Sequence, residues 1–121
     1  MAEYLIAFND DWVPDLTEEE IRERSRALRP LIAEMKERGV LIFTGGLNPE
    51  APTFSVDATS GTPVFTDGPY AETKEHLGGF AVVEVASEEE LRHWAAKIAE
   101  ACGWPQQVTP FMVPFEPIAD E

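Results

Sequence analysis

Residues 80–102 read FAVVEVASEEELRHWAAKIAEAC and join a strand pattern directly to a helix pattern. The run from Phe80 to Ala86 is apolar and rich in valine, which is typical of a buried strand. Ser87 with Glu90 has the spacing of a capping box at a helix start. The helix runs to about Cys102, and its inward positions are Leu91, Trp94, Ala95 and Ile98. This junction predicts a domain that mixes helices with a sheet.

The N-terminal part of the chain has the same order of patterns. Tyr4 to Phe8 reads as a strand, Thr17 to Arg38 as a helix and Val40 to Thr44 as a second strand. Near-helical spacing predicts a buried stripe of Ile21, Leu28, Leu31, Ile32 and Met35. Pro30 lies inside this helix and removes one backbone hydrogen bond, so we expect a kink there or a division into two helices.

The middle and the end of the chain supply the remaining elements. Thr53 to Ala58 and Thr62 to Thr66 read as a hairpin, and Asp67 to Gly79 reads as a loop. Val108 to Phe115 reads as the last strand. Its two prolines favour the edge of the sheet, because proline cannot donate to a strand ladder.

The resulting order, βαβ(ββ)βαβ, predicts one α+β domain over residues 1–121 with a ferredoxin-like fold. Two helices then cover one face of an antiparallel sheet. The strands at Val40 to Thr44 and Phe80 to Ala86 carry apolar residues on both sides, and two helices cannot cover both faces. We therefore expect a second copy of the chain on the open face, as in a twofold homodimer.

The charge balance narrows the classes of partner. Nine basic and 23 acidic residues give a net charge of −14, which disfavours nucleic acid and membrane surfaces. A single cysteine, Cys102, forms no internal disulfide, and the chain shows neither a signal peptide nor a run of the ~20 apolar residues that span a bilayer. These features predict a cytoplasmic protein.

The segment from Asp67 to Phe80, DGPYAETKEHLGGF, concentrates chemically active side chains between two strands. It holds carboxylates, a phenol, an ammonium group and an imidazole, and glycines flank it. Polar loops held by strands often carry function. The alternative is a solvated hairpin connection, with Asp67 and Gly68 serving the turn. From the residues alone both interpretations stand.

The same segment resembles the signature of the DGPF-domain proteins, a branch of the YCII-related family. That signature reads Asp-Gly-Pro-Phe-Ala-Glu-Thr-Lys-Glu-x-Leu-Gly-Gly-aromatic, and Tyr70 here replaces its Phe. Residues 39–41 and 46–47 fit as well, so the resemblance covers essentially the whole chain. It implies a ferredoxin-like dimer of the α+β-barrel superfamily. Many such proteins are uncharacterised, and some are encoded beside or fused to alternative sigma factors.

One departure from the wider family concerns acid–base chemistry. YCII-related proteins are associated with a His-Asp pair whose histidine lies on the first helix. The helix from Thr17 to Arg38 has no histidine, and Arg29 lies near the expected place. Asp67 matches the acidic half of the loop signature. His76 stands at a variable position of the signature, and either Arg29 or His76 could substitute for the missing basic half.

The superfamily resemblance implies a small enzyme that transfers protons on an aromatic or lactone-type substrate, without metal or organic cofactor. Such chemistry needs a base and a group that stabilises the developing oxyanion. The candidate catalytic residues are Asp67 as base, with Lys74, His76 and Arg29 as donors or cations. The candidate substrate-binding residues are Gly68, Pro69, Tyr70, Glu72, Trp12 and Phe43.

Other interpretations remain open. The chain could be a non-catalytic small-molecule-binding module, or a regulatory accessory linked to transcription regulation, or a dimeric scaffold with a structural loop. Two histidines and one cysteine, far apart, offer no zinc spacing, so we expect no metal. His93 lies off the apolar stripe and is expected to face solvent. Cys102 is expected in the core.

Overall fold

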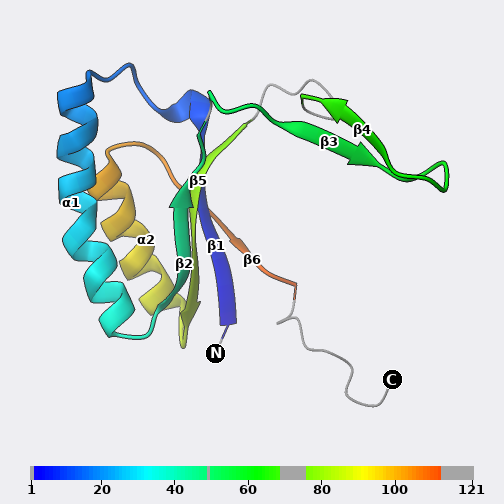
Figure 1. The fold of residues 1–121 in the computed structure, drawn as a ribbon. Helices are drawn as coiled ribbons and strands as arrows, with labels where there is room; N and C mark the ends of the chain where they lie inside the picture. The colour runs from blue at the N-terminus through cyan, green and yellow to red at the C-terminus, as the bar shows by residue number, and fades with distance from the viewer. Residues whose placement is uncertain (1, 49, 69–75, 113–121) are drawn as a thin grey trace, which may run out of the picture.

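The computed structural model describes residues 2–48, 50–68 and 76–112 (Figure 1). A short 3-10 helix, η1 (Asp10–Trp12), follows the first strand, and two α-helices are present, α1 (Glu18–Glu37) and α2 (Glu88–Cys102). The strands are β1 (Ala2–Asn9), β2 (Leu41–Gly46), β3 (Phe54–Asp57), β4 (Val64–Asp67), β5 (Leu77–Val85) and β6 (Gln107–Pro110). None of the helices in these ranges is long and apolar enough to cross a membrane.

Four strands form the main sheet in the order β2-β5-β1-β6, and all neighbouring strands are antiparallel. Both helices pack on one face of this sheet (Figure 1). The register places Ile6 of β1 opposite Ala81 of β5, and Leu5 opposite Val82. The ferredoxin-like α+β fold is therefore confirmed.

The core lies between the sheet and the helices. Alternate residues of β5 are buried on that side, and Val83 has no exposed surface. Helix α2 contributes more buried side chains than α1, in which Met35 alone is buried. The core cluster is Ile6, Met35, Val40, Ala81, Val83, Val85, Leu91, Trp94, Ile98 and Cys102. The inward positions expected of α2 are confirmed, and His93 is exposed as expected.

Both helices begin with the expected caps. Thr17 and Glu20 form a capping box in which both reciprocal hydrogen bonds measure 3.1 Å. At α2, the Ser87 hydroxyl accepts from the Glu90 backbone N–H, but the Glu90 carboxylate accepts from Ala86. The acidic first turns thus lie at the positive ends of the helix dipoles and satisfy free backbone N–H groups.

Two expectations for α1 are corrected. The helix is continuous through Pro30, so a division into two helices is wrong. Pro30 and Arg26 are exposed, and water can reach the Arg26 carbonyl that loses its N–H partner. Ile21, expected in the buried stripe, is also exposed, because packing against the core begins only at Leu28.

Two strand boundaries also differ from expectation. β5 begins at Leu77, so residues 77–79 belong to the strand and not to the preceding loop. A Cβ at Gly78 would lie 2.6 Å from a ring carbon of Phe8, so the glycines admit this ring. β6 pairs with β1 at the sheet edge as expected, but it ends at Pro110. Residues 113–115 of the expected strand lie outside the described residues.

The predicted hairpin is confirmed as β3 and β4, which pair with each other and form a separate two-stranded sheet. It projects away from the helices (Figure 1). The register puts Phe54, Val56 and Phe65 on one face, and the two phenyl rings lie 6.0 Å apart. This apolar face is exposed.

Candidate functional site

Two hollows lie on opposite faces of the main sheet, at the end where β1 finishes and β5 begins. The helix-side cavity lies between the sheet and the helices. The open-face groove lies on the other side, beside η1 and β6. Phe8 lines both hollows, so one strand end separates them.

The helix-side cavity has a volume of about 610 Å³. Most of its wall is apolar, and its lining residues come from α1, α2, β1, β5, the end of β2 and the segment after α2. Its lining residues are Ile6, Phe8, Ser25, Leu28, Arg29, Ile32, Ala33, Lys36, Thr44, Gly45, Gly46, Phe80, Ala81, Ile98, Cys102, Trp104 and Gln106. A mostly apolar hollow with a few polar groups is the usual form of a small-molecule site.

The charged side chains of this cavity are both basic. Arg29 and Lys36 lie seven residues apart on α1, about two turns, and therefore on one helix face. No carboxylate or imidazole occurs among the described residues that line it. The chain has 23 acidic and nine basic residues, so this cavity has the opposite charge balance to the protein.

Two residues that line this cavity, Trp104 and Gln106, each carry a buried donor that has no hydrogen-bond partner. These donors are the indole Nε1 of Trp104 and the side-chain nitrogen of Gln106, and neither bonds to any residue within the described ranges. Trp104 is held by Phe8, whose ring it meets edge-on at 5.4 Å between centroids. A buried donor without an acceptor is costly, which makes such groups candidates for ligand contacts.

Cys102 closes part of the cavity wall and is buried, as expected for a core cysteine. Burial raises the pKa of its thiol to about 11, against a smaller opposing effect of the Arg24 charge. The thiol is therefore protonated at neutral pH. In this state Cys102 adds apolar surface and acts neither as a base nor as a nucleophile.

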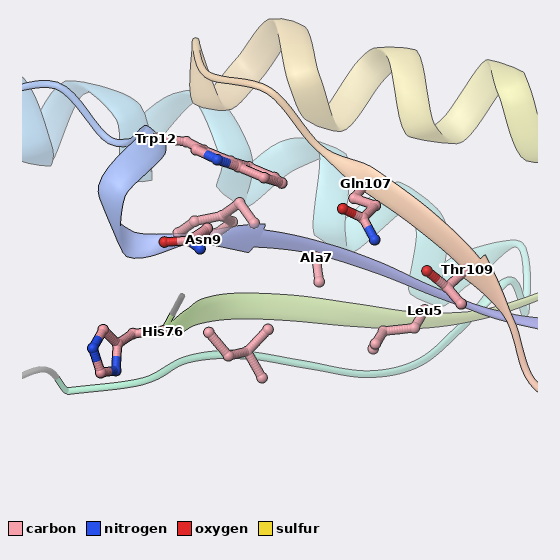
Figure 2. Close-up of a pocket in the computed structure, with 9 residues that line it drawn as sticks. Leu5, Ala7, Asn9, Trp12, His76, Gln107 and Thr109 are labelled. Atoms are coloured by element: carbon pink, nitrogen blue, oxygen red, sulfur yellow. The ribbon is translucent and has the colours of Figure 1, made fainter. Parts of the chain in front are cut away.

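The open-face groove is smaller, about 290 Å³. Figure 2 shows Trp12 and His76 at one end, with Gln107 and Thr109 of β6 along the wall. A backbone hydrogen bond joins η1, which contains Trp12, to His76, because the Asp10 N–H donates to the His76 carbonyl at 2.8 Å. The groove thus combines an indole wall, an imidazole and neutral polar groups.

The sequence-predicted site residues are distributed over several places. Trp12 and His76 share the open-face groove, while Arg29 lines the cavity on the opposite face. Phe43 lies on the open face, 60% exposed, with its ring 5.9 Å from that of Phe80. Asp67 is exposed at the end of β4, opposite Phe54 in the hairpin.

The segment that resembles the DGPF signature is described only at its two ends. Gly68 has φ +89°, its N–H donates to Thr53, and its carbonyl accepts from the Ser55 hydroxyl at 2.6 Å. These bonds continue the pairing of β3 with β4 by one residue beyond Phe54 and Asp67, at the open end of the hairpin. The other predicted residues of this loop, Pro69, Tyr70, Glu72 and Lys74, lie outside the described residues.

Sequence reasoning missed three groups of the helix-side cavity, namely Lys36, Trp104 and Gln106. The spacing of Lys36 from Arg29 could have placed both on one helix face. Trp104 and Gln106 follow α2 in an irregular segment, where no periodicity indicates which way a side chain points. Among the described residues, no group of three or more metal-binding side chains occurs.

Comparison with known proteins gives a family but no activity. The model of the YCII-related domain family matches residues 5–103. An uncharacterised protein of Rhizobium meliloti (strain 1021) is 31% identical over 100 residues, which cover 80% of this chain and 79% of that protein.

Proposed function

This chain belongs to the YCII-related family, and we propose that it binds a small, largely apolar molecule in the helix-side cavity. One observation carries the proposal: a hollow of about 610 Å³ lies against the core with a mostly apolar wall. Burying apolar ligand surface there provides the main driving force for binding.

The lining of this cavity favours binding over proton transfer. Acid–base catalysis needs a group that exchanges a proton near the working pH. The described lining offers arginine, lysine and hydroxyl groups together with the protonated Cys102 thiol. Of the functions that the sequence left open, a small-molecule-binding module therefore fits this cavity best.

A neutral fluorescent probe, N-phenyl-1-naphthylamine, tests the cavity directly. Ala33 lines the cavity and Ala27 lies outside it on the same helix, and both are exposed. Ala33→Trp should fill the cavity and weaken saturable probe binding at least about tenfold, a loss of ~1.4 kcal/mol. Ala27→Trp should leave binding unchanged. Equal binding in both variants, or no saturable binding by the unsubstituted protein, would contradict the proposal.

A second candidate function is acid–base catalysis in the open-face groove, on an aromatic or lactone-type substrate. It is favoured by the presence of both His76 and Trp12 in the lining of one groove, which therefore contains an imidazole and an aromatic side chain. Asp67 and Lys74, from the signature loop, remain the proposed carboxylate and cation.

Proton transfer can be followed by deuterium uptake at acidic C–H bonds of a lactone and hydroquinone panel in D2O. His76→Gln and Asp67→Asn should each abolish enzyme-dependent uptake, while the exposed His93→Gln should retain it. Uptake that survives both substitutions would exclude these two residues as the acid–base groups.

We also propose that a second copy of the chain covers the open face of the sheet. Phe43 and Leu77 expose large apolar surfaces there, which monomeric proteins rarely leave in contiguous patches. Light scattering should give twice the 13.5 kDa mass of the chain. Phe43→Asp should shift the mass to the monomer, and Ile21→Asp, at an exposed position on α1, should not. A monomer mass for the unsubstituted protein would refute the dimer.

A further inference from the structure

We infer that the helix-side cavity selects ligands that carry a carboxylate on an aromatic or aliphatic body. This inference rests on the proposed binding function and adds the chemical class of the ligand. The groups that carry it are two cations, Arg29 and Lys36, and two unpartnered donors, Trp104 and Gln106.

The charged side chains that line the cavity are basic. Arg29 and Lys36 are two of only nine basic residues in the chain, and the described lining contains none of its 23 acidic residues. The remaining surface repels anions, because the net charge is −14. Both cations are exposed, so water partly screens their attraction for a small anion, but this attraction still contrasts with the repulsion over most of the remaining surface.

Two lining residues have a side-chain N–H group that lacks a hydrogen-bond acceptor in the described part of the chain. The Trp104 indole and the Gln106 amide nitrogen are both donors, so the missing partner is an acceptor. A carboxylate has two oxygens and accepts without donating, which suits a site that offers N–H groups and cations together. Hydrogen bonds with an ionised acceptor are also roughly twice as strong as neutral ones.

The apolar part of the wall favours a ligand with an apolar body. A free inorganic anion would meet a wall formed largely by apolar groups such as Ile32, Ile98 and the protonated Cys102 thiol. Burying a charge beside such groups is costly unless the rest of the ligand gains from apolar contact. An organic acid satisfies both parts of the wall, with its body on the apolar side chains.

The alternative occupant of the unpartnered donors is water. Water molecules can accept from such N–H groups, and acids would then gain no hydrogen bond from Trp104 or Gln106 that the amides lack. The experiment therefore compares acids with uncharged ligands of the same shape, and it observes one of the donors directly.

The matched ligands are benzoate with benzamide, 2-naphthoate with 2-naphthamide, and octanoate with octanamide. Each ligand is titrated into the 15N-labelled full chain, and the three tryptophan indole N–H signals are followed by NMR. The signal that disappears in Trp104→Phe is assigned to Trp104. Trp94 is a built-in control, because its indole nitrogen is also buried and unpartnered but lies outside this cavity.

At least one acid should bind about tenfold or more tightly than its amide and move the Trp104 indole signal downfield. The Trp94 signal should stay in place. Arg29→Gln and Lys36→Gln should each weaken acid binding about three- to tenfold and leave amide binding unchanged. Arg22→Gln, which removes a cation of the same helix outside the cavity, is the matched control.

Equal affinity of acids and amides, or an acid that moves other cavity signals but not that of Trp104, would overturn the inference and leave the binding function standing. Binding of N-phenyl-1-naphthylamine without binding of any of the six ligands would also overturn the inference and leave the binding function standing. If that neutral probe also fails, the binding function itself is wrong.

Discussion

The two faces of the main sheet are built from neighbouring residues of the same strands, yet they have opposite surroundings. Val83 of β5 has no exposed surface and packs beneath the helices, whereas Val82 points to the face without helices. On β2, Phe43 shares the face of Val82 and is 60% exposed. The helices thus cover one apolar face of these strands, and the described part of this chain leaves the other face open.

The largest difference between the two faces of the sheet is expected in the reactivity of a cysteine thiol on each face. Because burial raises the pKa of Cys102 to about 11, the thiolate fraction at pH 8 is lower than for an exposed cysteine. Cys102 should react with an aromatic disulfide reagent at least ~100-fold more slowly than an exposed thiol. Its rate should rise about tenfold per pH unit until pH approaches the thiol pKa.

The comparison thiol is placed on the open face by Phe43→Cys in a Cys102→Ala background. In dilute protein this thiol should react rapidly, and its rate should level off near its unperturbed pKa of ~8.5. If a second copy covers the face, the rate should fall as the protein concentration rises. Equal rates for the two positions would show that burial does not distinguish the two faces.

The next largest difference is expected between Val82 and Val83, in how much each contributes to the free energy of unfolding. Val83→Ala should destabilise the protein by about 2–3 kcal/mol, because it removes buried methyl groups and leaves a cavity. Val82→Ala should cost less than about 1 kcal/mol in the monomer. Urea unfolding at several protein concentrations separates the two effects, since any dimer contribution of Val82 grows with concentration. A larger cost at Val82 in dilute protein would reverse the comparison.

The smallest contrast concerns the strand end where the two hollows meet. A Cβ at Gly79 would lie 2.9 Å from two carbons of the Phe8 ring, whereas a Cβ at Gly46 has open space. Gly79→Ala should cost about 1–3 kcal/mol through overpacking, and Gly46→Ala about 0.5 kcal/mol or less. Thermal unfolding measures both. Recovery of stability in a Phe8→Leu, Gly79→Ala double variant would show that the ring is the obstacle.

The fold was predictable from the sequence because its elements depend on local patterns. The capping pair Thr17 and Glu20 marked the start of α1, and the apolar run before Ser87 marked β5 and the start of α2. The sequence pattern predicts the start of β5 too late, because Gly78 and Gly79 are typical of a loop. They belong to the strand because they pair with β1 and β2 and leave space for the Phe8 ring.

The candidate site was less predictable, since its groups come together only through tertiary packing. Arg29 could be identified from its place on the first helix, but Trp104 and Gln106 come from an irregular segment after α2. His76 and Trp12 are brought together by one backbone hydrogen bond between η1 and the residue before β5. Neither hydropathy nor motif spacing encodes such contacts.

The packing of Phe8 against Gly78 and Gly79 has an evolutionary consequence. The pair of glycines belongs to the segment that resembles the DGPF signature, yet a ring from the first strand occupies the space where their Cβ atoms would lie. We therefore expect the residues at positions 8, 78 and 79 to vary together among homologues. We expect homologues that carry a small residue at position 8 to tolerate alanine or serine at position 79, so the motif records a covarying steric constraint as well as any chemistry of its loop.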